Sequence, residues 1–175
     1  MLNLHYLPWE TMYKMIKKMS VDCKTREFQF KLLHNILYTN ERLHRLNPVK
    51  FPTPMCTFCQ NNFENIEHLF YNCQYTKALW RDLLFCWGQP LKLQQPPSKQ
   101  CLILSDPNET LLVNFIGLLA RRYIYYSKMN DKKPNFQGLI PYIKRVYQIE
   151  YFIAYKNNKM GLHFKKWSPI LQYVR

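Results

Sequence analysis

The spacing of apolar residues along the first part of the chain predicts helices. Residues 11–19 form a short amphipathic pattern, and Asp22 is a suitable N-cap for a longer helix that runs to about residue 38. Thr39 or Asn40 can begin a third helix, which ends before Pro48 because a proline disfavours helical backbone at the preceding residue. The apolar positions of the second helix are Phe28, Leu32, Leu33, Ile36 and Leu37.

A fourth helix is predicted over residues 75–87, with Gly88 at the position of a C′ glycine. Residues 89–98 hold three prolines and read as a linker. The four-residue run Cys101–Leu104 is the best candidate for a short strand, although so short an apolar run fits either type of structure.

The clearest helix start lies at Asp106, which precedes a proline and stands three residues before Glu109 in a capping-box arrangement. This helix is predicted to reach Met129, and a second one to span about residues 135–157, with Pro141 shifting its start or kinking it. Two antiparallel helices joined by a short basic turn are the simplest interpretation.

The predicted fold class is therefore mainly α, a helical domain with a small zinc knuckle and a C-terminal helical hairpin. The predicted organisation is a helical region over residues 1–88 that contains the knuckle at 55–74, a linker at 89–105, and a basic C-terminal hairpin and tail at 106–175.

Composition argues against an enzyme. The four glycines stand singly, so neither a P-loop nor a dinucleotide-binding loop can form, and no serine lies in a G-x-S-x-G motif. The 11 acidic residues are scattered and provide no evident carboxylate pair. We find no apolar run long enough to span a bilayer and no secretory signal, and therefore expect an intracellular protein, nuclear or cytoplasmic or both.

The net charge of +14 makes polyanions the natural partners, with nucleic acid ahead of an anionic membrane surface. The charge is unevenly distributed. Residues 1–50 hold nine basic and four acidic residues, residues 51–100 four and three, and residues 101–175 twelve and four. The flanks of the chain, more than its middle, are therefore expected to make the cationic surface.

The near-neutral middle carries four metal-binding side chains in the pattern Cys-x2-Cys-x8-His-x4-Cys, formed by Cys56, Cys59, His68 and Cys73. Structural zinc sites close a tetrahedron with such Cys3His sets, and three thiolates with a neutral imidazole leave a net charge of about −1 on the centre. A redox-active Cys-x2-Cys is the runner-up, but no thioredoxin-like strand precedes it. We therefore predict a structural Zn²⁺ ion.

The run CTFCQNNFENIEHLFYNCQYTKALW resembles the reverse-transcriptase zinc-binding domain near the C-terminus of LINE-type, non-LTR retrotransposon proteins. The runs REFQFKLLHNILYTNERL, RRYIYYSKMNDKKPNF, YFIAYKNN and KKWSP are similar to other parts of that C-terminal region, so that the resemblance covers about residues 22–170. It assigns the metal-ligand places to the three cysteines and the histidine above. It assigns supporting places to Glu64, Leu69, Phe70 and Trp80, while Asn65 stands where many members have threonine.

The resemblance implies a part in handling element RNA or target DNA during target-primed reverse transcription. No polymerase motif occurs in these 175 residues. We therefore expect a non-catalytic module that binds RNA or single-stranded DNA. The competing hypothesis is a structural module that docks on a reverse-transcriptase core without recognising nucleic acid directly; association with a membrane surface is a third, weaker one.

Candidate nucleic-acid contacts come from aromatic and basic residues. Phe63 and Tyr71 flank the zinc loop and could stack on unpaired bases. Cations interleaved with tyrosines after residue 120 suit a phosphate backbone and its bases, although a solvated helix face with tyrosines packed on the partner helix explains the same pattern equally well. The basic candidates are Arg121, Arg122, Lys128, Lys132, Lys133, Lys144, Arg145, Lys165 and Lys166.

Overall fold

A computed structural model of the chain describes residues 9–20, 22–93 and 95–174. The start of the predicted N-terminal region, residues 1–8, and Gln94 in the predicted linker lie outside the described residues. The described part is mainly helical, which confirms the predicted fold class. Its only β pairing, within these ranges, is an isolated antiparallel bridge between Met55 and Phe63.

The helices before and around the zinc segment follow the predicted order. They are α1 (Trp9–Met19), α2 (Cys23–Leu33), α3 (Asn40–Leu46), a single π-helical turn η2 (His68–Asn72) and α4 (Gln74–Trp87). Asp22 and Thr39 are the N-caps of α2 and α3, as predicted, and their side chains accept hydrogen bonds from backbone N–H groups of the first turn.

Two helix ends differ from the prediction. Helix α2 ends at Leu33 because Asn35 adopts a left-handed conformation with a φ of 54°, and the N–H of Ile36 returns to the carbonyl of Lys31. Gly88 is not a left-handed C′ residue, since its φ is −57° and the chain continues to turn beyond it.

The second half contains α5 (Lys99–Leu104), α6 (Leu111–Met129), α7 (Phe136–Lys156), α8 (Met160–Trp167), a 3-10 turn η3 (Ser168–Ile170) and α9 (Leu171–Val174). The predicted strand at residues 101–104 is wrong. These residues are helical, because Ser98 caps the start of α5 and all four apolar side chains are buried around its short axis.

The predicted start of α6 at Asp106 is also wrong. The Asp106 carboxylate accepts the N–H of Asn108 in a local turn, and Thr110 is the N-cap of α6 instead. Helix α7 begins at its cap Asn135, close to the predicted residue, and contains Pro141 in its first turns. Residues 130–135 join α6 to α7 as a short connection.

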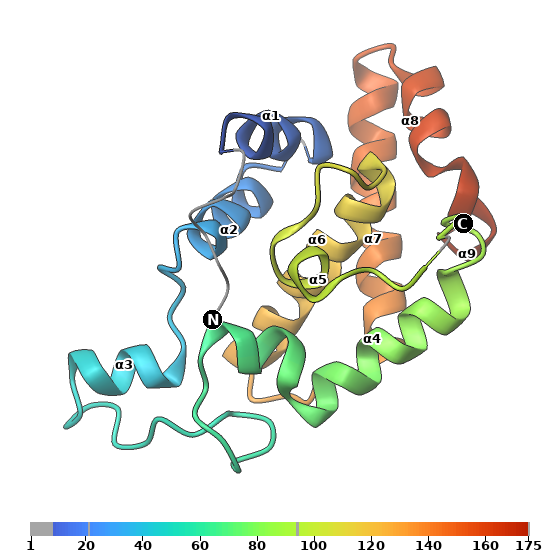
Figure 1. Cartoon of the computed structure of the whole chain (residues 1–175). Coiled ribbons are helices and arrows are strands. Elements are labelled where there is room, and N and C mark those ends of the chain that lie inside the picture. The colour runs from blue at the N-terminus through green and yellow to red at the C-terminus, as the bar shows by residue number, and fades with distance from the viewer. Residues whose placement is uncertain (1–8, 21, 94, 175) are drawn as a thin grey trace.

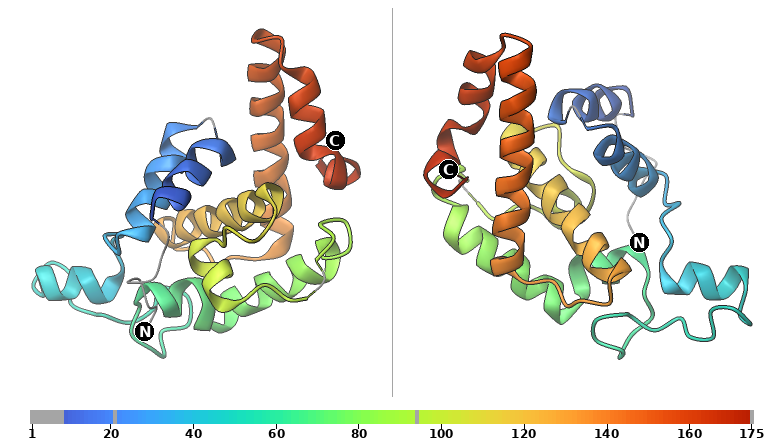
Figure 2. Two further views of the ribbon diagram at one scale, coloured as in Figure 1. Left: turned by 45° about the horizontal axis from the view of Figure 1, so that its top comes forward. Right: turned by 180° about the vertical axis from the view of Figure 1, so that it is seen from behind.

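Helix α6 lies at the centre of the molecule and contacts α1, α2, α5, α7 and η2 (Figure 1). Figure 2 shows α7 and α8 running side by side, whereas α6 crosses α7 at a wide angle. The closely packed antiparallel pair of the C-terminal region is thus α7 with α8. One apolar core joins both halves, and its largest side chains include Trp87, Trp167, Phe70 and Phe115.

None of the helices in the part of the chain that the structure describes combines the length and the apolar character needed to cross a bilayer.

Candidate metal centre and basic surface

The four predicted zinc ligands converge on one point. The ligand atoms of Cys56, Cys59, His68 and Cys73 all lie within 4.8 Å of one another. Cys56 Sγ is 3.9 Å from Cys73 Sγ, and Cys59 Sγ is 3.3 Å from His68 Nε2. Zinc at about 2.3 Å from sulfur and about 2.0–2.1 Å from nitrogen places tetrahedral ligands about 3.5–3.8 Å apart. The distances and the donor set therefore fit a closed Cys3His zinc site.

The first two ligands lie on a tight turn that contains no glycine. Gln60 supplies the left-handed conformation with a φ of 57°, and its N–H donates to the carbonyl of Cys56. The N–H of Phe58 points to Cys56 Sγ at 3.4 Å, and the N–H of Cys56 bonds to the carbonyl of Asn62. The backbone thus directs both thiols to the same side of the turn.

The other two ligands lie at the ends of the π-helical turn η2. The side chain of Asn65 accepts the N–H of His68 at 2.8 Å and holds the start of the turn. The N–H of Cys73 donates to the carbonyl of His68 over five residues, which is the hydrogen bond of a π-helical turn. The x4 gap between these ligands therefore corresponds to one π turn.

The surroundings favour the protonation state that zinc requires at two of the ligands, His68 and Cys73, whereas the hydrogen bond to Cys73 and burial raise the pKa of the Cys56 thiol. Burial lowers the pKa of His68, against a smaller effect of Glu64, and so favours the neutral imidazole. The neighbouring Cys56 thiol lowers the pKa of Cys73, and burial opposes it; the N–H groups of Tyr75 and Thr76 at the start of α4 lower it further. Metal binding needs a neutral imidazole and thiolates.

Beside the zinc ligands, Glu64 is fully enclosed, with 0% of its surface exposed. Its carboxylate accepts the N–H of Asn40 at the start of α3 and the N–H of Thr57 within the Cys-x2-Cys turn, at 3.0 and 2.8 Å. Lys128 of α6 lies 3.2 Å from the same carboxylate and donates to the side chain of Asn40. This network joins the zinc segment to two helices.

Lys128 was predicted as a phosphate contact, but it is an interior partner of Glu64. Sequence reasoning missed the pair because its members are far apart along the chain and nothing local marks them. The one signal available was the resemblance, which gave Glu64 a supporting place.

Two further basic candidates lie inside the protein. Arg121 is 0% exposed, and its guanidinium donates to Ser105, to Gln29 and to the carbonyls of Cys101 and Leu102 near the C-terminal end of α5. It caps that helix end, and burial lowers its pKa to about 10. Arg121 is therefore not a candidate for phosphate contact.

Lys166 bonds to both carboxylate oxygens of Glu150 at 2.8 and 2.9 Å and to the carbonyl of Met19. Burial lowers its pKa, and its ammonium group lies over the ring of Phe115. Like Lys128, it compensates a buried glutamate, although 18% of its side chain remains exposed.

The remaining candidates stay at the surface to different degrees. Arg122 is half-buried and pairs with Asp22 at 2.7 Å, and Lys144 is half-buried on α7. Phe63 is 55% exposed, whereas Tyr71 is half-buried with the ammonium group of Lys99 over its ring. Four of the candidate cations are exposed, namely Lys132, Lys133, Arg145 and Lys165.

Residues 5–80 match the family described as zinc-binding in reverse transcriptase. The match confirms the predicted reverse-transcriptase zinc-binding domain within these residues and includes all four metal ligands and Glu64. Helices α5 to α9 and Lys128 lie outside the matched segment. No curated protein matches the chain.

Proposed function

We propose that this chain is a non-catalytic, zinc-stabilised module of a LINE-type retrotransposon reverse transcriptase. It binds RNA or single-stranded DNA mainly through phosphates and assists target-primed reverse transcription in the nucleus or cytoplasm. The matched zinc-binding domain supports the association with reverse transcriptase. Within the described residues, four protein side chains surround the zinc position. This supports a structural role for the metal, because a catalytic zinc ion keeps one coordination position open for water or substrate.

The observation that carries nucleic-acid binding is the surface charge. The pairs Glu64–Lys128 and Glu150–Lys166 each remove one positive and one negative charge from the surface, so they leave the net charge of +14 unchanged. Arg121 keeps one positive charge inside. Most of the excess must therefore face solvent, where it attracts polyanions and releases their counterions on binding.

The connection between α6 and α7 is the best-placed part of this surface. Lys132 and Lys133 are exposed there, and the ammonium group of Lys133 lies 4.5 Å from the ring centre of Tyr75 on α4. Because Tyr75 follows Cys73 by two residues, the connection lies beside the zinc segment. The zinc then acts by fixing the position of α4 beneath these two cations.

Filter binding of a 20-nucleotide single-stranded RNA across a series of salt concentrations tests the proposal. Each phosphate contact to a single strand contributes about 0.7 to the slope of log K against log salt. The variant Lys132→Gln/Lys133→Gln should bind more weakly and lower the slope by about 1.4. The double variant Lys50→Gln/Lys92→Gln removes the same charge from two other exposed sites and is the matched control.

A wild-type affinity that does not change with salt would overturn nucleic-acid binding through phosphates. An equal loss of slope in both double variants would overturn the placement of the contact at the α6–α7 connection.

The competing function, docking on a reverse-transcriptase core, is favoured by one observation. Helix α7 exposes an apolar stripe at helical spacing, formed by Ile149, Phe152 and Tyr155. A docking module need not bind RNA by itself, so the same salt series separates the two functions.

A further inference from the structure

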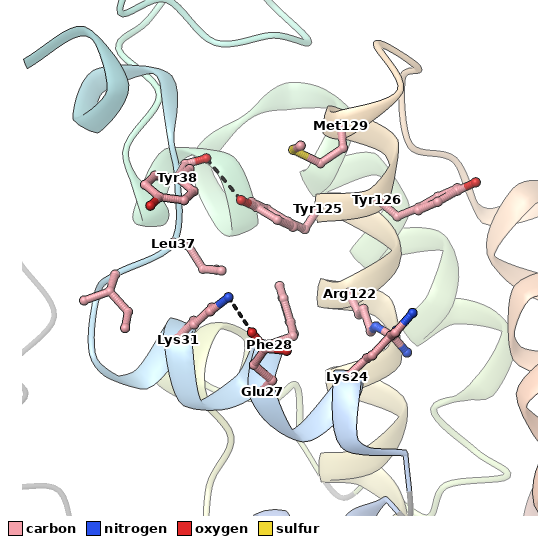
Figure 3. Close-up of a pocket in the computed structure, with 11 residues that line it drawn as sticks. Lys24, Glu27, Phe28, Lys31, Leu37, Tyr38, Arg122, Tyr125, Tyr126 and Met129 are labelled. Carbon is pink, nitrogen blue, oxygen red and sulfur yellow. Dashed lines mark hydrogen bonds and ion pairs between the residues drawn. The ribbon is translucent and has the colours of Figure 1, made fainter. Parts of the chain in front are cut away.

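A cleft opens between α2 and α6, and its wall is completed by the chain segment that follows α2 (Figure 3). The left-handed Asn35 reverses the chain at the end of α2 and brings residues 36–38 alongside it. The hydroxyl of Tyr125 donates to the backbone carbonyl of Tyr38 and ties α6 to this segment. The cleft is therefore built from α2, the segment that directly follows it, and the sequence-distant α6, and these hydrogen bonds fix the three parts to one another.

The interior of the cleft is aromatic and apolar. Phe28 points up from α2 into it, packing against Tyr125 with 5.7 Å between ring centres and edge-on against Phe70, which lies between the ligands His68 and Cys73. Tyr38 is 56% exposed and Met129 is 63% exposed, and both line the cleft. The exposed ring of Tyr38 and the side chain of Met129 offer apolar surface on which a flat ring can pack.

Cations surround this interior. Lys24 and Arg122 lie together at one end of the cleft in Figure 3, and Lys31 lies on the same helix as Lys24, nearer Tyr38. Arg122 is held in place by Asp22 and Thr25, and Lys31 by Glu27 at 2.6 Å. Three basic side chains and one acidic one, Glu27, line the cleft; counting Asp22, which pairs with Arg122, three positive and two negative charges leave a net charge of +1, which favours an anionic ligand.

The size of the cleft limits the ligand. Its volume is about 240 Å³, below the range of about 300–1,000 Å³ that is usual for sites of drug-sized molecules. A single planar ring system with charge on either side fits this combination of volume, aromatic wall and flanking cations. An unpaired base of a nucleic acid, with the phosphates of its own strand, has this chemistry.

We propose that the α2–α6 cleft binds one unpaired base of single-stranded RNA or DNA. The base packs against Phe28, Tyr125 and Tyr38, and a neighbouring phosphate lies between Lys24 and Arg122. This inference rests on the proposed nucleic-acid binding and deepens it. The proposed function involves contacts with phosphates, and the cleft adds a preference for strands with unpaired bases. A duplex, whose bases are stacked inside, cannot use the cleft.

The variant Tyr38→Ala tests the inference with little risk to the fold, because the exposed ring is removed while the backbone carbonyl that Tyr125 binds remains. Its affinity for a 12-nucleotide single strand should fall about tenfold, within the range for loss of one base–aromatic contact. Tyr38→Phe should bind like the wild type. Tyr155→Ala removes a tyrosine of similar exposure, 61%, on α7 and is the matched control.

A 12-nucleotide strand of abasic sites carries the same phosphates without bases. It therefore separates binding of the phosphates from binding of a base in the cleft. Wild type and Tyr38→Ala should bind it equally. A single 5-iodouracil in the normal strand, irradiated in the complex, should cross-link to the peptide that contains Tyr38, Phe28 or Tyr125, as mass spectrometry can establish.

If the wild type binds neither strand, the proposed function itself fails. If it binds both, while Tyr38→Ala and Tyr155→Ala behave alike on the normal strand, nucleic-acid binding stands and the base site is overturned. Cross-links that map only to other helices also overturn it, and would leave the cleft to a different occupant such as an aromatic side chain of a protein partner.

Discussion

The zinc segment and the α7–α8 pair each bury a glutamate against a lysine, yet they are ordered by different means. Around Glu64 the partners are backbone N–H groups of Asn40 and Thr57, in a segment with little regular structure. Around Glu150 they are the indole N–H of Trp167 and the ammonium group of Lys166, within a packed aromatic cluster.

The comparison teaches that a basic sequence is not the same as a basic surface. Both lysines were predicted to contact phosphates, and both neutralise a buried carboxylate instead. The zinc segment depends on a metal and a polar network, and the α7–α8 pair on side-chain packing. The two regions should therefore respond differently when metal, buried charge or pH is changed.

Loss of zinc should produce the largest difference between the regions. Structural zinc contributes binding free energy of about 10–16 kcal/mol in small zinc domains, as much as the whole stability of many proteins. Cys73→Ser should therefore lose bound zinc and the order of residues 55–73, while the helical signal of α7 and α8 falls less. Metal analysis and hydrogen exchange followed by mass spectrometry measure the two effects.

Cys86→Ser is the matched control, because Cys86 is an exposed cysteine on α4, outside the ligand cluster. Zinc content and exchange rates that are the same in both variants would contradict the assignment of Cys73 as a ligand.

Removal of one member of a buried ion pair should have the second-largest effect. Removing Lys128 or Glu64 alone leaves an uncompensated buried group and should lower the free energy of unfolding by about 3–5 kcal/mol. The double variant Glu64→Gln/Lys128→Met should lose less than the sum of the singles. A double-mutant cycle measured by urea unfolding of the zinc-loaded protein yields this coupling.

Two other pairs provide the comparison. The side chains of Lys166 and Glu150 are 18% and 9% exposed, against 6% and 0% for Lys128 and Glu64, so their coupling should be smaller. Lys14 and Glu10 are largely exposed on α1, and their coupling should not exceed about 1 kcal/mol. A coupling for Glu64 and Lys128 as small as that of the α1 pair would show that the network does not join the two regions.

A fall in pH should have the smallest effect and concern α8. Burial lowers the pKa of His163, with Lys166 acting in the same direction and Glu150 against it; Lys18 and Lys159 line the cavity beside it. The unfolded chain then takes up a proton before the folded protein does. His163 thus favours folding above about pH 6.5, and this contribution is lost as the pH falls through its lower folded pKa.

The difference in stability between the wild type and His163→Gln should therefore be smaller at pH 5.5 than at pH 7.5. Thermal unfolding of both proteins at the two pH values measures it. His68 is present in both proteins, so that its protonation and any loss of zinc affect the two alike. A difference that stays constant with pH would show that His163 does not sense pH in the folded protein.

Much of the local structure could be predicted because its causes are local. Asp22, Thr39 and Asn135 accept N–H groups of the helices that they begin, and such caps are readable from neighbouring residues. The end of α2 was missed because Asn35, and not a glycine, takes the left-handed conformation. The strand predicted at residues 101–104 failed for another reason: Ser98 caps the start of α5 locally, but the carbonyls at its C-terminal end are satisfied by Arg121 and Gln29 from distant helices.

By itself, the sequence determined the helical class, the four zinc ligands and the excess of positive charge, because periodicity, ligand spacing and composition do not depend on how the helices pack. Only the tertiary structure decided which cations remain outside. Arg121, Lys128 and Lys166 turn inward to partners that lie 16 to 147 residues away in the chain, which no local pattern reveals. The α2–α6 cleft also exists only after packing, since it takes its aromatic and basic side chains from separate segments.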